Sequence, residues 1–289
     1  MSRIMTDQMQ TPDGNLVSNA LLQQVIPSGY RYHDLLIETN IPASSFSAIS
    51  VNKSADALFS LSGHEIVNVL ERMSNRNPTK IIPLRFTDVD AMTRESQERT
   101  ALIPYDNEQW LLKMQLGILP TTVPAGGWFL RVHRRFSSVM GIAIQNGQPY
   151  QFLRAREFER RFDRKTMTAV VEGENTFDKL IRDPSVNIRK ILFKGDIEEV
   201  EFFCKTNGET KANWKVTKAL NEYLLKVSAQ KNGYQIPAGY FPIDFTAGGH
   251  PFADMMVTAY DEIIIKFKSK NTNPVEILTE YVRDVRNQS

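Results

Sequence analysis

The chain contains the same succession of strand and helix patterns twice, and this duplication limits the folds that it can adopt. The first copy includes IIPLRFTD and NEQWLLKMQL within residues 81–116, and the second includes GYFPIDFTA and DEIIIKFKSK within residues 239–270. In each copy a strand with an early proline, Pro83 or Pro242, precedes a strand in which apolar and polar residues alternate. Because strand side chains alternate between faces, each alternating strand predicts a sheet with one buried face.

A helical segment precedes each proline-bearing strand. In residues 62–73 the apolar side chains follow the spacing i, i+3, i+4, i+7, and Ser62 with Glu65 fits a capping box that starts a helix. Residues 211–227 carry a similar apolar stripe and predict the second helix. Two short apolar strands precede each helix, so five elements recur in the same order about 155 residues apart. The sequence therefore predicts two copies of one β-rich unit.

The length of 289 residues suits two domains of similar size. We predict a division at residues 147–149, which gives domains 1–148 and 149–289. The first domain begins with a polar arm of about 29 residues. This arm is either a disordered tail with a first strand or short helix, or a segment that orders against a neighbouring subunit.

Composition excludes several classes of function. A net charge of +2 is too balanced for a protein whose affinity for nucleic acid depends on neutralising phosphates. The single cysteine, Cys204, permits no internal disulfide, which fits assembly in a reducing cytoplasm, and it lies in a strand as a small buried hydrophobe. No run of about 18 apolar residues and no secretory signal is present, so we expect no membrane-spanning helix.

Three short motifs have both a chemical and a structural interpretation. Asp88 and Asp90 could supply two oxygen ligands to a divalent cation, but two carboxylates suit a solvated loop better. The basic run at residues 133–135 is either a patch for nucleic acid or phospholipid headgroups, or a solvated strand face or subunit contact. The glycines at residues 248–249 form either an anion-binding nest or a tight turn. The sequence does not decide whether a structural calcium ion is bound.

No motif for catalysis is present. The four histidines are scattered, and HExxH, GxSxG and P-loop patterns are absent from the sequence. We therefore expect no enzyme, with no catalytic, cofactor-binding or metal-binding residue and no cofactor. The dense mixture of arginines and acids at residues 151–162 predicts ion pairs, either lateral or across an interface.

The remaining segments complete an all-β architecture of about eight short strands per half, which favours sandwiches. Residues 116–150 are interpreted as a loop and two further strands that complete the first unit. Residues 173–187 are interpreted as a polar connection, and residues 275–285 as the last strand.

Residues 34–73, 151–173, 188–203 and 275–282 carry a resemblance to a known family. The chain resembles the double jelly-roll major capsid proteins of membrane-containing icosahedral bacteriophages, corticovirus-like or finnlakevirus-like. This resemblance implies an all-β fold of two tandem eight-stranded jelly rolls, each with one inserted helix. It also implies a homotrimer that forms a pseudo-hexameric capsomer, with upright strands and with the termini near an internal membrane.

The resemblance further implies that the partners are other copies of the chain, neighbouring capsomers, a vertex (penton) protein and the underlying viral membrane or its proteins, with no specific nucleic acid. The protein would be part of the virion, assembled in the host cytoplasm. We expect residues 16–26 to contact neighbours or the membrane, so that deleting residues 1–29 leaves trimers intact.

Two alternatives belong to other classes of protein. A tandem β-sandwich receptor- or carbohydrate-binding module would use Trp128 or Trp214 in a shallow aromatic site. A hydrolase on the same fold would need carboxylates that only folding brings together.

Overall fold

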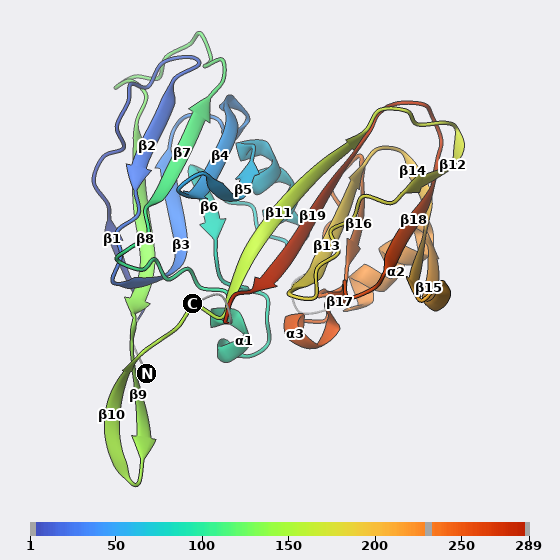
Figure 1. The fold of residues 1–289 in the computed structure, drawn as a ribbon. Helices are drawn as coiled ribbons and strands as arrows, with labels where there is room; N and C mark the ends of the chain where they lie inside the picture. The colour runs from blue at the N-terminus through green and yellow to red at the C-terminus, as the bar shows by residue number, and fades with distance from the viewer. Residues whose placement is uncertain (1–3, 229–232, 287–289) are drawn as a thin grey trace.

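The computed structural model describes residues 4–228 and 233–286, and it consists of two β-sandwiches that lie side by side (Figure 1). Each sandwich has two sheets built on four antiparallel strands, as expected for a double jelly roll. The predicted fold class, two tandem eight-stranded jelly rolls, is confirmed.

The first sandwich contains eight strands in two sheets. One sheet has the order β1-β8-β3-β6 and the other β2-β7-β4-β5. In chain order the strands are β1 (Met5–Gln8), β2 (Leu21–Val25), β3 (Tyr30–Thr39), β4 (Phe46–Lys53), β5 (Asp56–Leu61), β6 (Ile81–Arg85), β7 (Trp110–Leu116) and β8 (Leu130–Ser138).

The second sandwich repeats this arrangement. Its sheets have the orders β11-β19-β13-β16 and β12-β18-β14-β15, and a short strand, β17, also pairs with β13. In chain order the strands are β11 (Phe158–Met167), β12 (Gly173–Phe177), β13 (Val186–Lys194), β14 (Ile197–Thr206), β15 (Glu209–Thr217), β16 (Tyr240–Asp244), β17 (Met256–Val257), β18 (Glu262–Ser269) and β19 (Val275–Asp284).

The two sandwiches match residue by residue where the prolines lie. Pro83 of β6 pairs with Leu36 of β3, and Pro242 of β16 pairs with Leu192 of β13. Both prolines are on edge strands of their sheets, where the missing N–H removes no ladder hydrogen bond. The repeated sequence pattern therefore forms equivalent edge strands, β6 and β16, in the two sandwiches.

A helix precedes each proline-bearing strand, as predicted. In the first sandwich it takes the wider π-helical pitch over η2 (Glu65–Glu71), and in the second it is α2 (Lys218–Ser228). The expected start of the second helix at residue 211 is wrong, because residues 211–217 belong to β15 and pair with β14. Three shorter helical turns are η1 (Ala43–Ser45), α1 (Arg94–Glu98) and α3 (Pro251–Asp254).

The capping box is confirmed. The Ser62 backbone N–H donates to Glu65 Oε2 at 2.7 Å, and the Glu65 N–H donates to Ser62 Oγ at 3.2 Å. These reciprocal bonds satisfy donors that a helix start leaves without partners.

Residues 140–153 do not complete the first sandwich, which corrects that expectation. They form a separate hairpin of β9 (Met140–Gln145) and β10 (Gln148–Leu153), which projects beyond the sandwiches (Figure 1). The division expected between residues 148 and 149 falls at the start of β10, just after the turn of this hairpin, and as a domain boundary it stays a prediction.

The N-terminal segment is part of the first sandwich rather than an arm. β1 pairs with β8 and β2 pairs with β7, and Leu22 and Ile26 are buried in the core. Deleting residues 1–29 would remove two strands of the first sandwich, and the survival of trimers after this deletion stays a prediction. Residues 173–187 are also not a plain connection, because β12 lies within them.

Each sandwich has an apolar core, and the first core continues across the junction to Leu192 and Leu278 of the second sandwich. Trp110 and Phe46 are fully buried in the first, and Phe193 and Phe267 in the second. Cys204 is buried in the second core, as predicted, and burial raises the pKa of its thiol. Among the described residues, no helix is long and apolar enough to cross a membrane.

Candidate functional site: the junction and the surfaces that remain open

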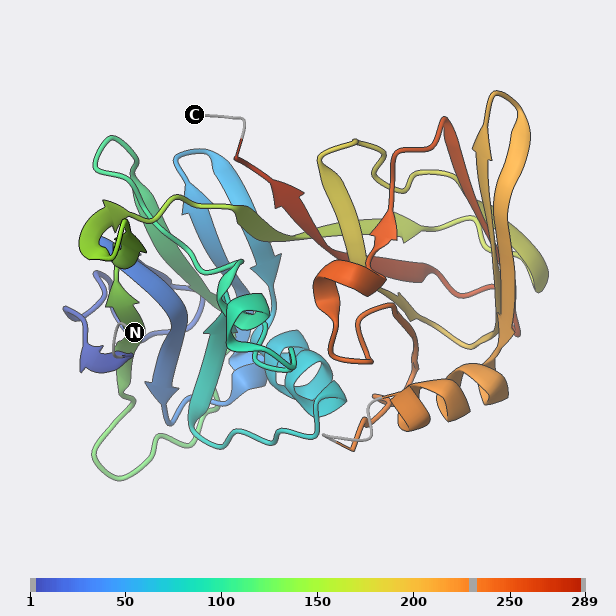
Figure 2. The ribbon, with the colours of Figure 1, turned by 90° about the horizontal axis from the view of Figure 1, so that it is seen from below.

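The junction between the sandwiches starts at the helix η2, which lies between them (Figure 2). Glu65, the acid of the capping box, also forms an ion pair with Arg164 of β11 at 2.6 Å. The same carboxylate therefore caps the first helix and holds the second sandwich. Phe59 and Phe162 add an edge-to-face aromatic contact nearby, with ring centroids 5.9 Å apart.

Arginines in β11 and in the segment just before it bind acids of the first sandwich. Arg161 donates to Asp56 at 2.7 Å and also to Glu159 on its own strand at 2.6 Å. Arg156 contacts Glu108 at 2.5 Å. The predicted ion pairs of this stretch are thus confirmed, and they cross the junction between the two halves of one chain.

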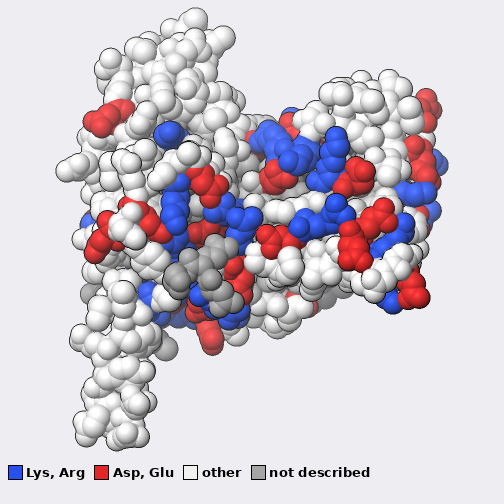
Figure 3. Space-filling view, viewed as in Figure 1, with Lys and Arg blue, Asp and Glu red and all other residues white. Residues whose placement is uncertain are grey.

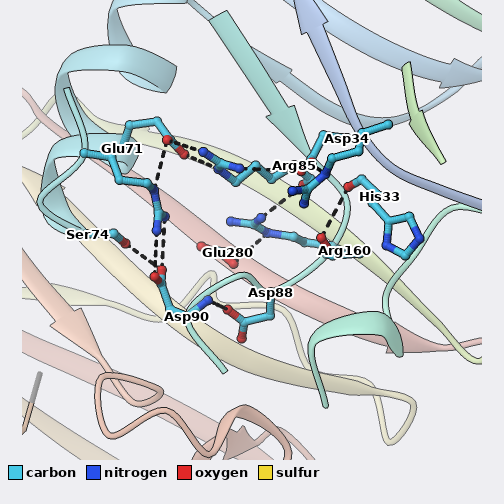
Figure 4. Close-up of polar contacts among 12 residues, drawn as sticks. His33, Asp34, Glu71, Ser74, Arg85, Asp88, Asp90, Arg160 and Glu280 are labelled. Atoms are coloured by element: carbon cyan, nitrogen blue, oxygen red, sulfur yellow. Dashed lines mark hydrogen bonds and ion pairs between the residues drawn. The ribbon is translucent and has the colours of Figure 1, made fainter. Parts of the chain in front are cut away.

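A second layer of charges lies beneath, between η2 and the loop that follows β6 (Figure 4). Glu71 accepts hydrogen bonds from Arg85 at 2.6 Å and from Arg76 at 3.0 Å. Arg76 also donates to Asp90 at 2.7 Å, and the Ser74 hydroxyl donates to the same carboxylate. Burial opposes ionisation of Asp90, but these bonds hold its pKa at about 2.

The deepest part of the junction is an ion cluster on the inner sheet of the second sandwich. Arg189 of β13 pairs with Asp88 of the first sandwich and with Glu280 of β19, 3.2 Å away. Arg160 also binds Glu280 at 2.8 Å and donates to the backbone carbonyl of Arg85. Burial disfavours the Glu280 carboxylate, yet the surrounding cations lower its pKa to about 2. The two sandwiches are therefore locked by buried, compensated charges.

Two sequence candidates, Asp88 and Asp90, lie in this junction and not in a solvated loop. Both carboxylates bind arginine, Asp88 to Arg189 and Asp90 to Arg76. In the described parts of the chain, no group of three or more His, Cys, Asp or Glu side chains is placed to hold a metal ion. Their role here is structural pairing. Sequence reasoning missed it because the partner of Asp88 is 101 residues away.

The basic run at residues 133–135 is neutralised within its own sheet. His133 lies 2.9 Å from Glu38, Arg134 pairs with Asp7 at 2.6 Å, and Arg135 with Asp34 at 2.5 Å. The run is therefore a strand face whose charges are paired within the sheet, which the solvated-face interpretation did not include.

The glycine turn at residues 248–249 also belongs to the junction. Gly249 has a φ of +81°, in the left-handed region, and its carbonyl accepts a hydrogen bond from the Met92 N–H of the first sandwich at 2.9 Å. The tight-turn interpretation accounts for this geometry.

The two tryptophans singled out for a glycan site are packing residues. Trp214 stacks on Phe202 with centroids 4.1 Å apart and meets Phe245 edge-on. Trp128 is partly buried against the first core.

Two groups of exposed apolar side chains lie on the hairpin β9–β10 and on the helix α2. In the hairpin β9–β10 the residues 139–153 include no Lys, Arg, Asp or Glu, and Figure 3 shows it uncharged beside a body of mixed charge. The other group lies on one face of α2. Its exposed apolar side chains are Leu220, Tyr223, Leu224 and Val227.

Two similar jelly rolls in one chain, joined through a charged junction, define a double jelly-roll protein. Models of the two halves of one protein family match this chain. The N-terminal domain of viral coat protein P2 matches residues 10–126, and its C-terminal domain matches residues 159–285. The chain belongs to the viral coat protein P2 family, a family of structural capsid proteins and not of enzymes.

Solved structures with the same fold come from several viruses. The major capsid protein P2 of bacteriophage PM2 has a TM-score of 0.77 at 16% identity, with 99% of each chain covered. The MCP of STIV has a TM-score of 0.68 at 14% identity, covering 96% of each chain. The PBCV-1 virus capsid has a TM-score of 0.56 at 10% identity, with 98% of this chain and 94% of the other covered. A comparison with curated protein sequences found no match.

Proposed function

We propose that this protein is the major capsid protein of an icosahedral bacteriophage with an internal membrane, and that three copies form a pseudo-hexameric capsomer. The observation that carries the proposal is the equivalence of the two sandwiches. Pro83 and Pro242 occupy the same position in them, each on an edge strand and each paired with a leucine of the neighbouring strand. Membership of a coat protein family and the likeness to the PM2 capsid protein support it.

The duplication suits this role for a geometric reason. Three chains with two equivalent sandwiches each present six similar units, so a trimer can fill a hexagonal position in a shell. A six-sided unit cannot occupy a five-fold vertex, so a different vertex protein completes the shell. The particle would be assembled in the host cytoplasm, which the absence of disulfides in this chain supports.

We propose that the β9–β10 hairpin, and not residues 16–26, reaches the internal membrane. Residues 21–25 form β2, in which Leu22 and Gln24 point into the protein. The hairpin instead exposes Ile142 and Ile144 on one face and Tyr150 and Phe152 on the other. It projects from the end of the molecule at which β19 finishes (Figure 1). An uncharged segment that is apolar on both faces suits the headgroup boundary of a bilayer.

Electron microscopy of the purified protein tests the capsid proposal. We expect three-fold particles with six lobes around a centre. Single two-lobed particles together with measurable glycan affinity would instead favour the carbohydrate-binding alternative.

A further inference from the structure

The helices η2 and α2 occupy equivalent positions in the two sandwiches. Leu61 pairs with Ile49 at the end of β5, and Val216 pairs with Val200 at the end of β15. The next residue caps the helix in each case. The Glu65 N–H donates to Ser62 Oγ, and the Leu220 N–H donates to Thr217 Oγ1 at 3.4 Å. Leu220 is therefore the counterpart of Glu65.

The equivalent positions differ in what covers them. Glu65 is only 5% exposed because β11 of the second sandwich lies against it. Leu220 is 48% exposed, and Tyr223, three residues on, is 65% exposed. α2 lies along the margin of the second sandwich, and the described part of the chain supplies no further sandwich beyond it (Figure 2). An apolar stripe at i, i+3, i+4 and i+7 normally faces a packed surface.

The strands β1 and β11 also occupy equivalent positions in the two sandwiches. Gln8 pairs with His133, which pairs with Leu36, and Arg164 pairs with Leu278, which pairs with Leu192. Since Leu36 and Leu192 are counterparts, Gln8 corresponds to Arg164. By the same register, Met5 near the start of β1 corresponds to Arg161.

β1 is open where β11 is covered. Arg161 is 7% exposed beneath the first sandwich, whereas Met5 is 45% exposed, and Ile4 beside it is exposed as well. The two elements that meet in the junction, η2 and β11, thus each have an exposed counterpart in the other sandwich, which are α2 and β1. The uncovered helix and the uncovered strand both present apolar side chains where the covered ones present ions.

We propose that the apolar face of α2 in one copy packs against β1 of a second copy, with Leu220 close to Gln8. This inference rests on the proposed function, because it uses another copy of the chain. The contact repeats the geometry of the Glu65–Arg164 junction, with Leu220 and Gln8 in place of the ion pair. A contact between two different surfaces of one chain continues from copy to copy, and it closes as a ring of three when a three-fold rotation relates successive copies.

A pair of introduced cysteines tests the contact directly. In the chain, the ends of the Glu65 and Arg164 side chains meet at 2.6 Å, so cysteines at these positions lie within reach of a short bis-maleimide cross-linker, and Gln8→Cys with Leu220→Cys in one chain should be cross-linked between copies by this reagent. Denaturing gels should show covalent dimers and trimers. Glu65→Cys with Arg164→Cys is the positive control and should close within one chain. Gln8→Cys with Thr210→Cys, at the far end of β15, is the negative control.

Light scattering on unmodified protein separates the two possible failures. If the protein is trimeric and the variant with Gln8→Cys and Leu220→Cys gives no ladder, the inference is overturned and the capsid proposal stands. If the unmodified protein is monomeric, the trimeric capsomer fails and the inference falls with it.

A charge substitution gives a second measurement. Leu220→Lys with Leu224→Lys should convert trimers to monomers and leave the thermal transition unchanged, because both side chains are exposed in one chain. Ile118→Lys, at another exposed apolar position, should leave trimers intact. Trimers that persist in the double variant would contradict the proposed contact.

Discussion

Arg189 of the second sandwich donates a hydrogen bond to Asp88 of the first, and both side chains are almost completely buried. Separating the sandwiches would leave both charges without compensation in an apolar setting, which is costly. The chain therefore behaves as one body, although each half has an apolar core. A fixed angle between the halves is what a capsomer of six similar units requires.

The first prediction concerns this ion pair. Asp88→Ala leaves the buried Arg189 with Glu280 as its remaining close acid, and the free energy of unfolding should fall by about 3–5 kcal/mol. Chemical denaturation followed by tryptophan fluorescence measures the change. Lys266→Ala, which removes a pair with Glu174 on an exposed strand face, is the matched control and should leave the midpoint where it was. Equal midpoints for both variants would refute a locking role for Asp88.

Acid should weaken the junction in a defined pH range. The pKa of Glu280 is about 2 in the folded protein against an ordinary value of 4.5, so the unfolded chain binds more protons between these values. Its stabilising contribution is complete above pH 4.5 and is lost as the pH falls toward 2. Denaturation midpoints measured across this range should decline, and Glu280→Gln should decline less steeply. A parallel decline in both proteins would contradict this assignment.

The buried His33 should make the stability of the fold depend on pH in a higher range, between about 4 and 6.5. Burial lowers the pKa of His33 from 6.5 to about 4, and its Nε2 lies 2.9 Å from Ser137 Oγ. Between these values the unfolded chain takes up a proton that the folded one does not, so stability falls as the pH drops below 6.5. NMR titration of the His33 ring measures this directly. A midpoint near 6.5 in the folded protein would show that the ring is not desolvated.

The capping box can be separated from the junction by two variants. Ser62→Ala removes only the cap and should cost about 1 kcal/mol. Glu65→Ala removes the acceptor of the Ser62 backbone N–H, which is the other half of the capping box, together with the contact with Arg164, and should cost about 2–3 kcal/mol. Arg164→Ala removes the contact alone. If Glu65→Ala is no more harmful than Ser62→Ala, the ion pair contributes nothing across the junction.

The hairpin should be dispensable for folding. The Arg154 N–H donates to the Val139 carbonyl at 3.0 Å, so a two-residue Asn-Gly turn can replace residues 140–153. Since almost all side chains of the hairpin are exposed, the thermal transition should not change. Flotation with phospholipid vesicles should be lost. A variant that floats like the original protein would exclude the hairpin as the membrane contact.

Local signals predicted much of this fold. Ser62 with Glu65 located a helix start, and the alternation around Trp110 and Ile265 located central strands, because these patterns depend on neighbours in sequence. The polar strand β1 has no such pattern. Its existence depends on hydrogen bonds to β8, about 130 residues away in sequence, so the N-terminal segment was interpreted as an arm.

The only sequence signal of the junction was the dense mixture of arginines and acids at residues 151–162, which did not identify their partners. The arginines of β11 predicted ion pairs, but their partners Asp56 and Glu65 are separated from them by 105 and 99 residues. The apolar stripe of α2 was predicted correctly in part, yet periodicity cannot say whether such a face meets the chain's own core or another molecule. Here the face containing Leu220 and Tyr223 points away from the sandwich.

Light scattering coupled to size-exclusion chromatography tests the central claim most directly, because a chain built as two of six units needs two further copies. A mass of about 99 kDa, three times the 33.0 kDa of the chain, is expected. A species that stays at 33.0 kDa over a wide range of concentration would contradict the account.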